Sequence, residues 1–211
     1  MGKPLVSWAI EIGKRTCDQV VVSSDDPEVL SLAELYKVHA LERPAELARD
    51  DTPMLDVLTH VLACEPGPSD CVVLLQPTSP LRQDRHIKQA RWALTLKGHS
   101  DSVVSVVEIP AHMSPDWAMS LELGTGYLRP VMDGRYPTRR QDCRVTYYRD
   151  GTVYAIRTAL LRRGEFYGRS SPLLIPASES CTLDTEEDWE KAEEMWGAVH
   201  ALQQKDLSHA L

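Results

Sequence analysis

Apolar residues near the N-terminus recur first at helical spacing and then in a continuous run. Leu5, Trp8 and Ile12 fall on one helical face. The next apolar run, residues 20–22, is β-branched and ends in Ser-Ser-Asp-Asp, which is a turn signal. The pattern therefore predicts a helix that is followed by a buried strand.

Helix and strand patterns keep alternating along most of the chain. Helix starts are predicted where a capping residue precedes apolar residues at helical spacing, which occurs at Asp26-Pro27, at Thr52-Pro53 and at Asp84. Continuous apolar runs predict further strands at residues 38–41, 72–75, 102–107, 147–156 and 173–175. Short strands that are apolar on both faces are typical of a sheet covered by helices on both sides. The predicted fold class is α/β, with a doubly wound, mostly parallel, Rossmann-like sheet.

The predicted last helix starts at Glu186. Thr185 and Asp188 have the spacing of a capping box at its start. Its predicted apolar face consists of Trp189, Ala192, Trp196 and Val199.

The alternation breaks down after the strand at residues 102–107. Pro, Gly, Asp and aromatic residues dominate residues 110–144, and the next strand, at residues 147–156, is predicted to be interrupted at Asp150-Gly151. We interpret residues 1–211 as one nucleotidyltransferase-like domain in which about 110–156 form an inserted dimerisation arm. Its aromatic residues predict packing against a second subunit, and the alternative is a self-packed hairpin; they include Trp117, Tyr136, Tyr147 and Tyr148.

Composition narrows the possible functions. The chain has 211 residues, of which 43% are hydrophobic and 26% charged, a balance typical of one globular domain. A net charge of −8 argues against a protein that mainly binds nucleic acid or an anionic membrane surface. No apolar run is long enough to span a bilayer, so we expect a cytoplasmic protein. The five cysteines are scattered without a CxxC motif, which predicts buried thiols rather than a zinc site or a disulfide framework.

Polar side chains follow the strand predicted at residues 72–75. Gln76, Thr78 and Ser79 lie in a proline-rich loop that leaves this strand at its carboxyl end. Ligands of open α/β sheets bind at this end of the strands, and uncharged donors and acceptors suit sugar hydroxyls. The alternative is a plain turn stiffened by proline and capped by hydroxyls.

Two charged residues, Arg43 and Asp184, also lie at the ends of predicted elements, where a ligand could bind. Arg43 follows the strand at residues 38–41 and could bind a phosphate or a base carbonyl, although a solvated surface arginine is the common alternative. Asp184 directly precedes the last helix, where it could bind Mg²⁺ or act as a second capping group. We expect Gln76, Arg43 and Asp184 to border one cleft at the carboxyl ends of the strands.

Several sequence blocks resemble one family when they are taken together. The acylneuraminate cytidylyltransferase family, also called CMP-sialic acid synthetases, has similar blocks in the same order along nearly the whole chain. They are VVSSDD at 21–26, RPAELA at 43–48, LLQPTSPLR at 74–82, RRQD at 139–142, YYRDGTVY at 147–154 and LDTEEDW at 183–189.

The resemblance implies a reaction and roles for particular residues. In this family the anomeric hydroxyl of a 2-keto sugar acid attacks the α-phosphate of CTP, Mg²⁺ neutralises charge, and pyrophosphate leaves. The implied nucleotide-binding residues are Arg43, Asp51, Thr52, Pro53 and Leu55. The implied sugar-binding residues are Gln76, Thr78, Ser79, Arg140, Tyr154, Phe166 and Tyr167, of which the last two match an aromatic pair that the dimer partner inserts. Asp184 is the implied catalytic metal ligand.

The sequence departs from the family pattern in two places. The family begins with a strand and a Pro-Ala-Arg-x-Gly-Ser-Lys loop that binds the CTP phosphates, whereas this chain starts later, at Met1-Gly2-Lys3. Thr182 also replaces one of two aspartates near the metal. We therefore expect the strands at Val20 and Val72 to lack a partner, and the chain as printed to be a poor catalyst. The alternatives are a related enzyme for Kdo, legionaminate, pseudaminate or another sugar, and a noncatalytic sugar-binding or dimerising subunit.

Overall fold

The computed structural model describes residues 2–65, 67–96, 100–132 and 137–208, the last eleven of them in backbone only. The chain begins with α1 (Leu5–Thr16), β1 (Val21–Ser24), α2 (Pro27–Leu35) and β2 (His39–Glu42). As predicted, the Asp26 side chain caps α2 and accepts a hydrogen bond from the Glu28 N–H at 2.8 Å. Between these elements lies a buried apolar cluster of Ile10, Val22 and Ala33.

The remaining regular elements are α3 (Met54–Cys64), β3 (Cys71–Leu74), α4 (Asp84–Leu96), β4 (Ser102–Glu108), β5 (Met119–Glu122), β6 (Tyr127–Pro130), β7 (Tyr147–Arg157), α5 (Thr158–Leu161), β8 (Ser170–Leu174) and α6 (Glu186–Ser208). They include the other predicted helices and strands in the predicted order, and α5, β5 and β6, which the sequence pattern did not predict. Short 3₁₀ turns connect them: η1 (Ala45–Leu47), η2 (Ala111–Met113), η3 (Pro115–Trp117), η4 (Arg140–Asp142) and η5 (Ala177–Glu179). None of the described helices is both long and apolar enough to cross a membrane.

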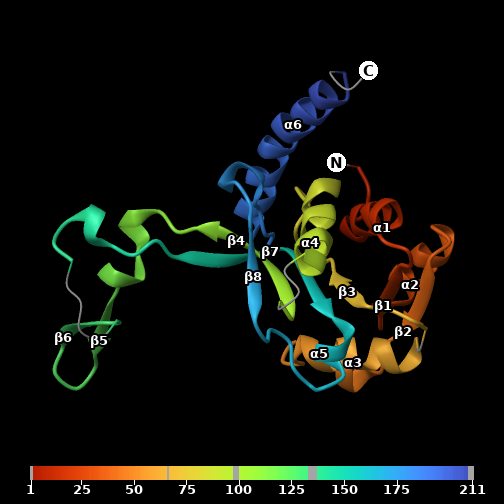
Figure 1. Cartoon of the computed structure of the whole chain (residues 1–211), viewed down its shortest axis with the longest axis horizontal. Helices are drawn as coiled ribbons and strands as arrows, with labels where there is room; N and C mark the ends of the chain where they lie inside the picture. The colour runs from red at the N-terminus through yellow and green to blue at the C-terminus, as the bar shows by residue number, and fades with distance from the viewer. Residues whose placement is uncertain (1, 66, 97–99, 133–136, 209–211) are drawn as a thin grey trace.

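The main sheet has four strands in the order β3-β7-β4-β8 (Figure 1). Strands β4 and β8 are parallel, and β7 runs antiparallel to both β3 and β4. Three of the four strands therefore share one direction, and β7 is the exception. Its reversed direction follows from its connection, because β7 returns from the arm directly beside β4 instead of through a crossover helix.

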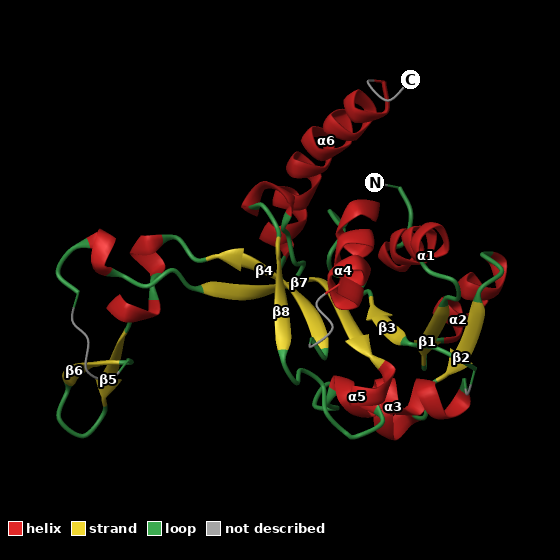
Figure 2. Cartoon of the chain, viewed as in Figure 1, coloured by secondary structure: helices red, strands yellow, loops and turns green. Residues whose placement is uncertain are grey.

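Helices cover both faces of this sheet, which confirms the doubly wound α/β fold (Figure 2). Alternate residues of β7 point to opposite faces. Val153 and Ala155 pack in a cluster with Ile87 of α4 and Ile12 of α1. Tyr154 and Ile156 pack on the other side, against residues of α3 and α5.

Strands β1 and β2 form a separate two-stranded parallel sheet. Among the described residues, β1 pairs only with β2 and β3 only with β7, so each has one open edge, as predicted for the strands at Val20 and Val72. Helix α1 bridges the two sheets at Gly13. A Cβ atom there would lie 3.1 Å from Val20 and 3.7 Å from Leu75, so the missing side chain allows the close approach.

A long excursion separates β4 from β7 and carries the β5–β6 hairpin away from the sheet (Figure 1). Asp116 anchors its base, because its buried carboxylate binds the backbone N–H of Arg144 at 2.8 Å and the guanidinium of the same residue. The predicted arm boundary at 156 is too late, since β7 pairs within the main sheet from Tyr147 to Arg157. We use "the arm" for residues 109–146.

Three local predictions need correction. The strand at Asp150-Gly151 is not interrupted but bulged: its pairing with β4 shifts register between Val104 and Val106. Asp84 is the first residue of α4, and its carboxylate pairs with Arg15.

The third correction concerns α6. Trp189 is 42% exposed, and the helix packs through Ala192, Met195 and Trp196 instead. The side chain of Val199 and the whole of Tyr136 lie outside the described residues.

Candidate functional site

The loop that follows β3 is held in place by Arg82. Its guanidinium donates from Nη2 to the carbonyl oxygen of Gln76 at 2.7 Å and from Nε to the carbonyl oxygen of Thr152 in β7. Burial lowers the pKa of Arg82 to about 10, while the nearby charge of Asp150 acts in the opposite direction. The side chain therefore stays charged at pH 7 and ties the loop to the bulge of β7.

The bulge brings polar side chains from three segments together. Gly151 has a φ of 76°, which an L side chain rarely adopts. A Cβ atom on Gly151 would lie 3.4 Å from Ser79 Oγ, 3.7 Å from Gln76 Oε1 and 3.8 Å from Thr182 Oγ1. The glycine thus leaves room for these three polar groups to converge. Ser79 is only 3% exposed, and its hydroxyl has no hydrogen-bond partner within the described part of the chain.

The segment before α6 is bound to the same two elements. Thr182 donates from its hydroxyl to the Asp150 carbonyl at 2.8 Å, and the Leu183 N–H donates to the Thr78 carbonyl at 2.9 Å. These bonds place Asp184 immediately beside the loop. The structure therefore brings together the segments of Gln76, Thr78, Ser79 and Asp184, as the sequence predicts.

Asp184 presents an exposed carboxylate. Its backbone N–H donates to Asp188 Oδ2 at 3.1 Å, which fixes the start of α6. In the described chain no group of three or more His, Cys, Asp or Glu residues could hold a metal. A single carboxylate oxygen still fits Mg²⁺, because this ion keeps several waters and takes further ligands from substrate phosphates.

The predicted nucleotide-binding residues lie around the ends of β1 and β2 and the start of α3. Arg43 is half-buried and donates from Nε to Ser23 Oγ at 3.2 Å and from Nη2 to the Ser23 carbonyl, so it lies at the carboxyl end of β1. Asp51 is paired with Arg49 at the surface.

Thr52 and Pro53 form the turn that starts α3. The side chain of Leu55 packs against the cluster of Leu58 and Ile156. Its side chain is thus partly buried against the core, whereas Asp51 and Pro53 in the same turn are exposed.

Three predicted aromatic residues form one group. The rings of Tyr154 and Phe166 meet edge to face at 5.8 Å, and those of Phe166 and Tyr167 at 4.8 Å. Phe166 therefore packs against Tyr154 of its own chain. Burial raises the pKa of the Tyr154 hydroxyl, and the charge of Arg149 opposes this shift.

The backbone of this aromatic loop is fixed at Gly168. Ser102 Oγ donates to the Tyr167 carbonyl at 2.5 Å. Gly168 has a φ of 53°, and a Cβ atom there would lie 2.7 Å from Asp101. Only glycine fits this position without a shift, so the loop holds Phe166 and Tyr167 in one conformation.

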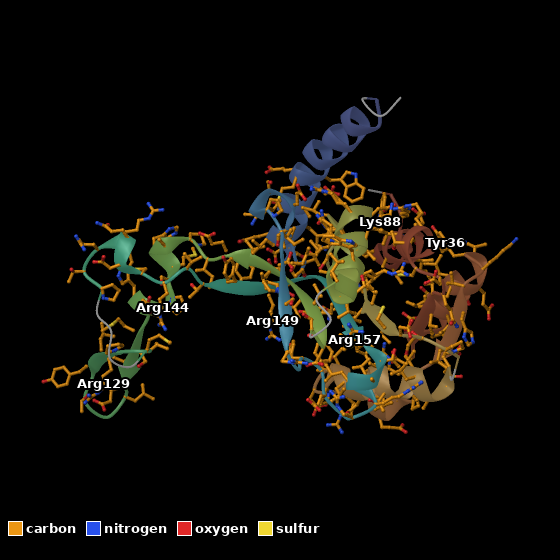
Figure 3. All side chains as sticks on the ribbon, in the orientation of Figure 1. Tyr36, Lys88, Arg129, Arg144, Arg149 and Arg157 are labelled. Atoms are coloured by element: carbon orange, nitrogen blue, oxygen red, sulfur yellow. The ribbon has the colours of Figure 1, made fainter. Side chains whose placement is uncertain are left out.

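The sequence analysis missed Arg149. It lies where the arm joins the sheet, further in than Arg144 (Figure 3), and its guanidinium lies 5.1 Å from the centre of the Tyr167 ring. Its position directly before Asp150-Gly151 was the available signal. The predicted Arg140, in contrast, lies in η4, which belongs to the arm and not to the loop around Gln76.

Three comparisons with known proteins agree with this architecture. A family model described as "Cytidylyltransferase" matches residues 1–117. The CMP-N,N'-diacetyllegionaminic acid synthase of Legionella pneumophila is 28% identical over 209 residues, which cover 92% of this chain and 85% of that protein.

Two N-acylneuraminate cytidylyltransferases are also similar. The protein of Oncorhynchus mykiss is 26% identical over 92% of this chain, and that of Streptococcus agalactiae is 31% identical over 89%. The chain covers only 44% and 46% of these two relatives, so it spans about half of their length.

Solved structures show the same fold at low sequence identity. A CMP:2-keto-3-deoxy-manno-octonic acid synthetase in complex with CTP superposes with a TM-score of 0.68 and 17% identity, covering 94% of this chain and 89% of that one. A 4-diphosphocytidyl-2C-methyl-D-erythritol synthase from Anaerococcus prevotii gives 0.57 and 13%, covering 96% and 87%.

Proposed function

Because the chain belongs to the cytidylyltransferase family, we propose that it transfers the cytidylyl group of CTP to a sialic-acid-like 2-keto sugar acid. The observation that supports this activity most directly is the convergence of Gln76, Ser79 and Thr182 around Gly151, beside Asp184. This convergence lies next to the loop that leaves β3, where α/β sheets bind ligands.

The proposed reaction is a displacement at phosphorus. The anomeric hydroxyl oxygen of the sugar acid bonds to the α-phosphorus of CTP, the bond to the bridging oxygen of pyrophosphate breaks, and the hydroxyl proton passes to solvent. Such a reaction depends mainly on positioning and on neutralising charge. Gln76, Thr78 and Ser79 bind sugar hydroxyls, Tyr154 with Phe166 and Tyr167 borders the sugar, and Arg43 with residues 51–55 binds the nucleotide.

Cations complete the proposed site. Arg149 lies next to the aromatic group and is suited to bind the carboxylate of the sugar acid through its planar fork. Asp184 would hold Mg²⁺ together with the phosphates of CTP, and the metal would neutralise charge on them.

The arm is proposed to mediate a homodimer. It carries many of the exposed large apolar side chains of the described residues, among them Met113, Met119, Leu121, Leu123, Tyr127 and Leu128. Leu123 is 92% exposed and Tyr127 72%, an exposure that a stable monomer would rarely maintain. In a dimer the arm would also bring Arg140 to the partner's sugar site. Sedimentation showing a stable monomer at micromolar concentration would contradict the dimer.

The choice of sugar acid has one specific pointer. The legionaminic acid synthase compared above is 28% identical over 209 residues. A legionaminate-type substrate is therefore the second candidate. The cytoplasm remains the predicted location.

A substrate panel tests the proposed activity. The chain is incubated with CTP, Mg²⁺ and, in turn, N-acetylneuraminate, a legionaminate, a pseudaminate and Kdo, and CMP-sugar is measured by mass spectrometry. We expect slow formation of product with at least one sugar acid, because Thr182 stands where the family has a second aspartate. The product should be lost in Gln76→Ala and kept in the control Gln89→Ala, an exposed change on α4. Absence of product with every sugar, together with retained sugar binding, would support the noncatalytic subunit instead.

A further inference from the structure

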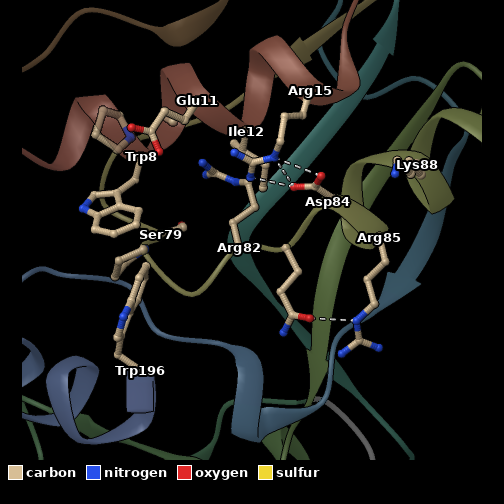
Figure 4. Close-up of a pocket in the computed structure, with 14 residues that line it drawn as sticks. Trp8, Glu11, Ile12, Arg15, Ser79, Arg82, Asp84, Arg85, Lys88 and Trp196 are labelled. Carbon is tan, nitrogen blue, oxygen red and sulfur yellow. Dashed lines mark hydrogen bonds and ion pairs between the residues drawn. The ribbon is translucent and has the colours of Figure 1, made fainter. Parts of the chain in front are cut away.

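A pocket of about 550 Å³ lies behind the loop that carries Gln76 (Figure 4). Its walls come from α1, from residues 77–83 of the loop, from the first turns of α4 and from Trp196 of α6. Of the residues assigned to the proposed site, Ser79 lines the pocket, whereas Gln76, Thr78 and Asp184 do not. The pocket therefore adjoins the proposed sugar site, and the loop with Ser79 is the wall between them.

The pocket carries positive charge without a matching negative charge. Arg15 and Arg85 on its wall are neutralised by Asp84 and Glu179. Glu11, also on the wall, is neutralised by Lys3. Arg82 and Lys88 also line it, and neither forms an ion pair with any residue that the structure describes.

Arg82 is the more deeply placed of the two free cations. Its Nε and Nη2 atoms donate to backbone carbonyls, and Nη1 makes no hydrogen bond to the described residues. A buried guanidinium without a counter-ion is costly, and an anion in the pocket would offset that cost. The pKa of about 10 at Arg82 reflects this desolvation.

The same wall contains apolar rings and unsatisfied polar atoms. The rings of Trp8 and Trp196 meet edge to face at 4.4 Å and form an aromatic side of the pocket. Trp8 Nε1 is buried and lacks a hydrogen-bond partner among the described residues. Ser79 Oγ is unpaired too, but it lies next to Gly151 and belongs to the proposed sugar site. Buried polar atoms in native proteins usually have partners, so the unpaired Trp8 Nε1 points to a missing ligand at this pocket.

We propose that this pocket binds a phosphate ester with a planar ring, of the size of a nucleoside monophosphate. A phosphate monoester carries a charge of about −1.5 to −2 at pH 7, which matches two free cations. The pocket volume is within the usual range for small-molecule sites, roughly 300 to 1,000 Å³. Arg82 and Lys88 bind the phosphate, and the ring packs beside the two tryptophans. A ligand here contacts Pro77 and Ser79 and so stiffens the loop of the proposed sugar site from behind.

Calorimetry with AMP tests the proposal on the full chain without CTP or Mg²⁺. We expect one binding site, weakened at least fivefold in Lys88→Glu and unchanged in the matched control Lys191→Glu on α6. Both lysines are exposed, so both variants should fold. Inorganic phosphate should bind at least tenfold more weakly than AMP because it lacks the ring.

Indole N–H signals in NMR locate the ligand. AMP should shift the signals of Trp8 and Trp196 and leave those of Trp92 and Trp117 in place. Lack of AMP binding, equal weakening by both lysine variants, equal affinity for inorganic phosphate, or displacement of AMP by an equimolar amount of CTP would each overturn the proposal. The last result would assign the cations to the substrate nucleotide.

Discussion

The loop around Gln76 and the arm are stabilised by opposite means. The loop is tied to two other segments by hydrogen bonds from Arg82, Thr182 and Leu183, and Ser79 within it is almost fully buried. Among its described residues the arm has a buried anchor, Asp116 with Arg144, and beyond it the apolar side chains of β5 and β6 face solvent. The loop is held by contacts within one chain, whereas the apolar side chains of β5 and β6 would gain contacts only in the proposed dimer.

We expect the largest difference in the free energy of unfolding between variants of two arginines, one in the loop around Gln76 and one on the arm. Arg82→Met leaves the carbonyls of Gln76 and Thr152 without their donor, and we expect a loss of about 2–4 kcal/mol in the free energy of unfolding. Arg129→Met on the arm removes only an exposed pair with Glu122, so we expect a change within about 0.5 kcal/mol. Urea unfolding measures both, and equal losses would mean that the loop is not the more strongly coupled region.

The next largest effect is expected when the Asp116 anchor of the arm is removed. Asp116→Ala removes the acceptor for the Arg144 backbone and guanidinium. We expect amide hydrogen exchange in the arm to accelerate by at least about tenfold, the equivalent of one charge-assisted hydrogen bond, while exchange in β7 beyond Val153 stays the same. Faster exchange throughout the main sheet would show that the arm and the core unfold together.

A smaller effect should appear with pH at the start of α4. Burial lowers the pKa of His86 from its ordinary 6.5, and Glu179 opposes this shift through a hydrogen bond to Nε2 of 2.9 Å. Arg85 also lowers the pKa and Asp150 raises it. Because the folded pKa lies below the unfolded one, the unfolded chain takes up the proton first as pH falls. Stability is therefore fully present above about pH 6.5 and decreases below it.

Two variants separate this effect from general acid sensitivity. His86→Gln keeps a donor for Glu179 but does not titrate, so its unfolding free energy should change less between about pH 7 and 5.5 than that of the wild type. His112→Gln, an exposed change on the arm, should leave the wild-type dependence intact. If the unfolding free energy of all three proteins changed equally with pH, His86 would be excluded as the source of this dependence.

The smallest effect on stability is expected at the tip of the arm. Leu123→Ser changes a side chain that is 92% exposed, and we expect the free energy of unfolding of the monomer to change by less than about 0.5 kcal/mol. Sedimentation should nevertheless show weaker self-association if Leu123 contacts the partner. A large stability loss in the monomer would mean that the arm packs on its own chain.

The sequence predicted the core better than the arm for a physical reason. Caps and helical spacing act locally, so Asp26 and the Thr185–Asp188 pair could be identified directly. Strand direction could not, because a strand that is apolar on both faces has the same pattern in a parallel and an antiparallel sheet. The central, reversed position of β7 depends on the path of the arm, which has no such local signal.

The candidate site, too, was predicted from the sequence only where the signal is local. The rule that ligands bind at strand ends predicted that Gln76, Arg43 and Asp184 would border one cleft. The bonds of Thr78 and Thr182 join the segments of Gln76 and Asp184, whereas Arg43 is bonded to Ser23 of β1, in the separate two-stranded sheet. Arg82 was missed as an organising residue because arginine is usually exposed. Arg140 was assigned to the same site, but its distance from Gln76 is set by the arm and so depends on tertiary structure.

The central place of β7 also determines when the sheet can form during synthesis. Strand β3 ends at Leu74 and β4 at Glu108, yet in the described sheet they are joined only through β7, which ends at Arg157. A growing chain would have to keep both apolar strands from pairing wrongly until the arm and β7 have left the ribosome. Contacts this distant in sequence slow folding and leave strand edges exposed meanwhile. The arm thus delays the closure of the main sheet in every newly made molecule.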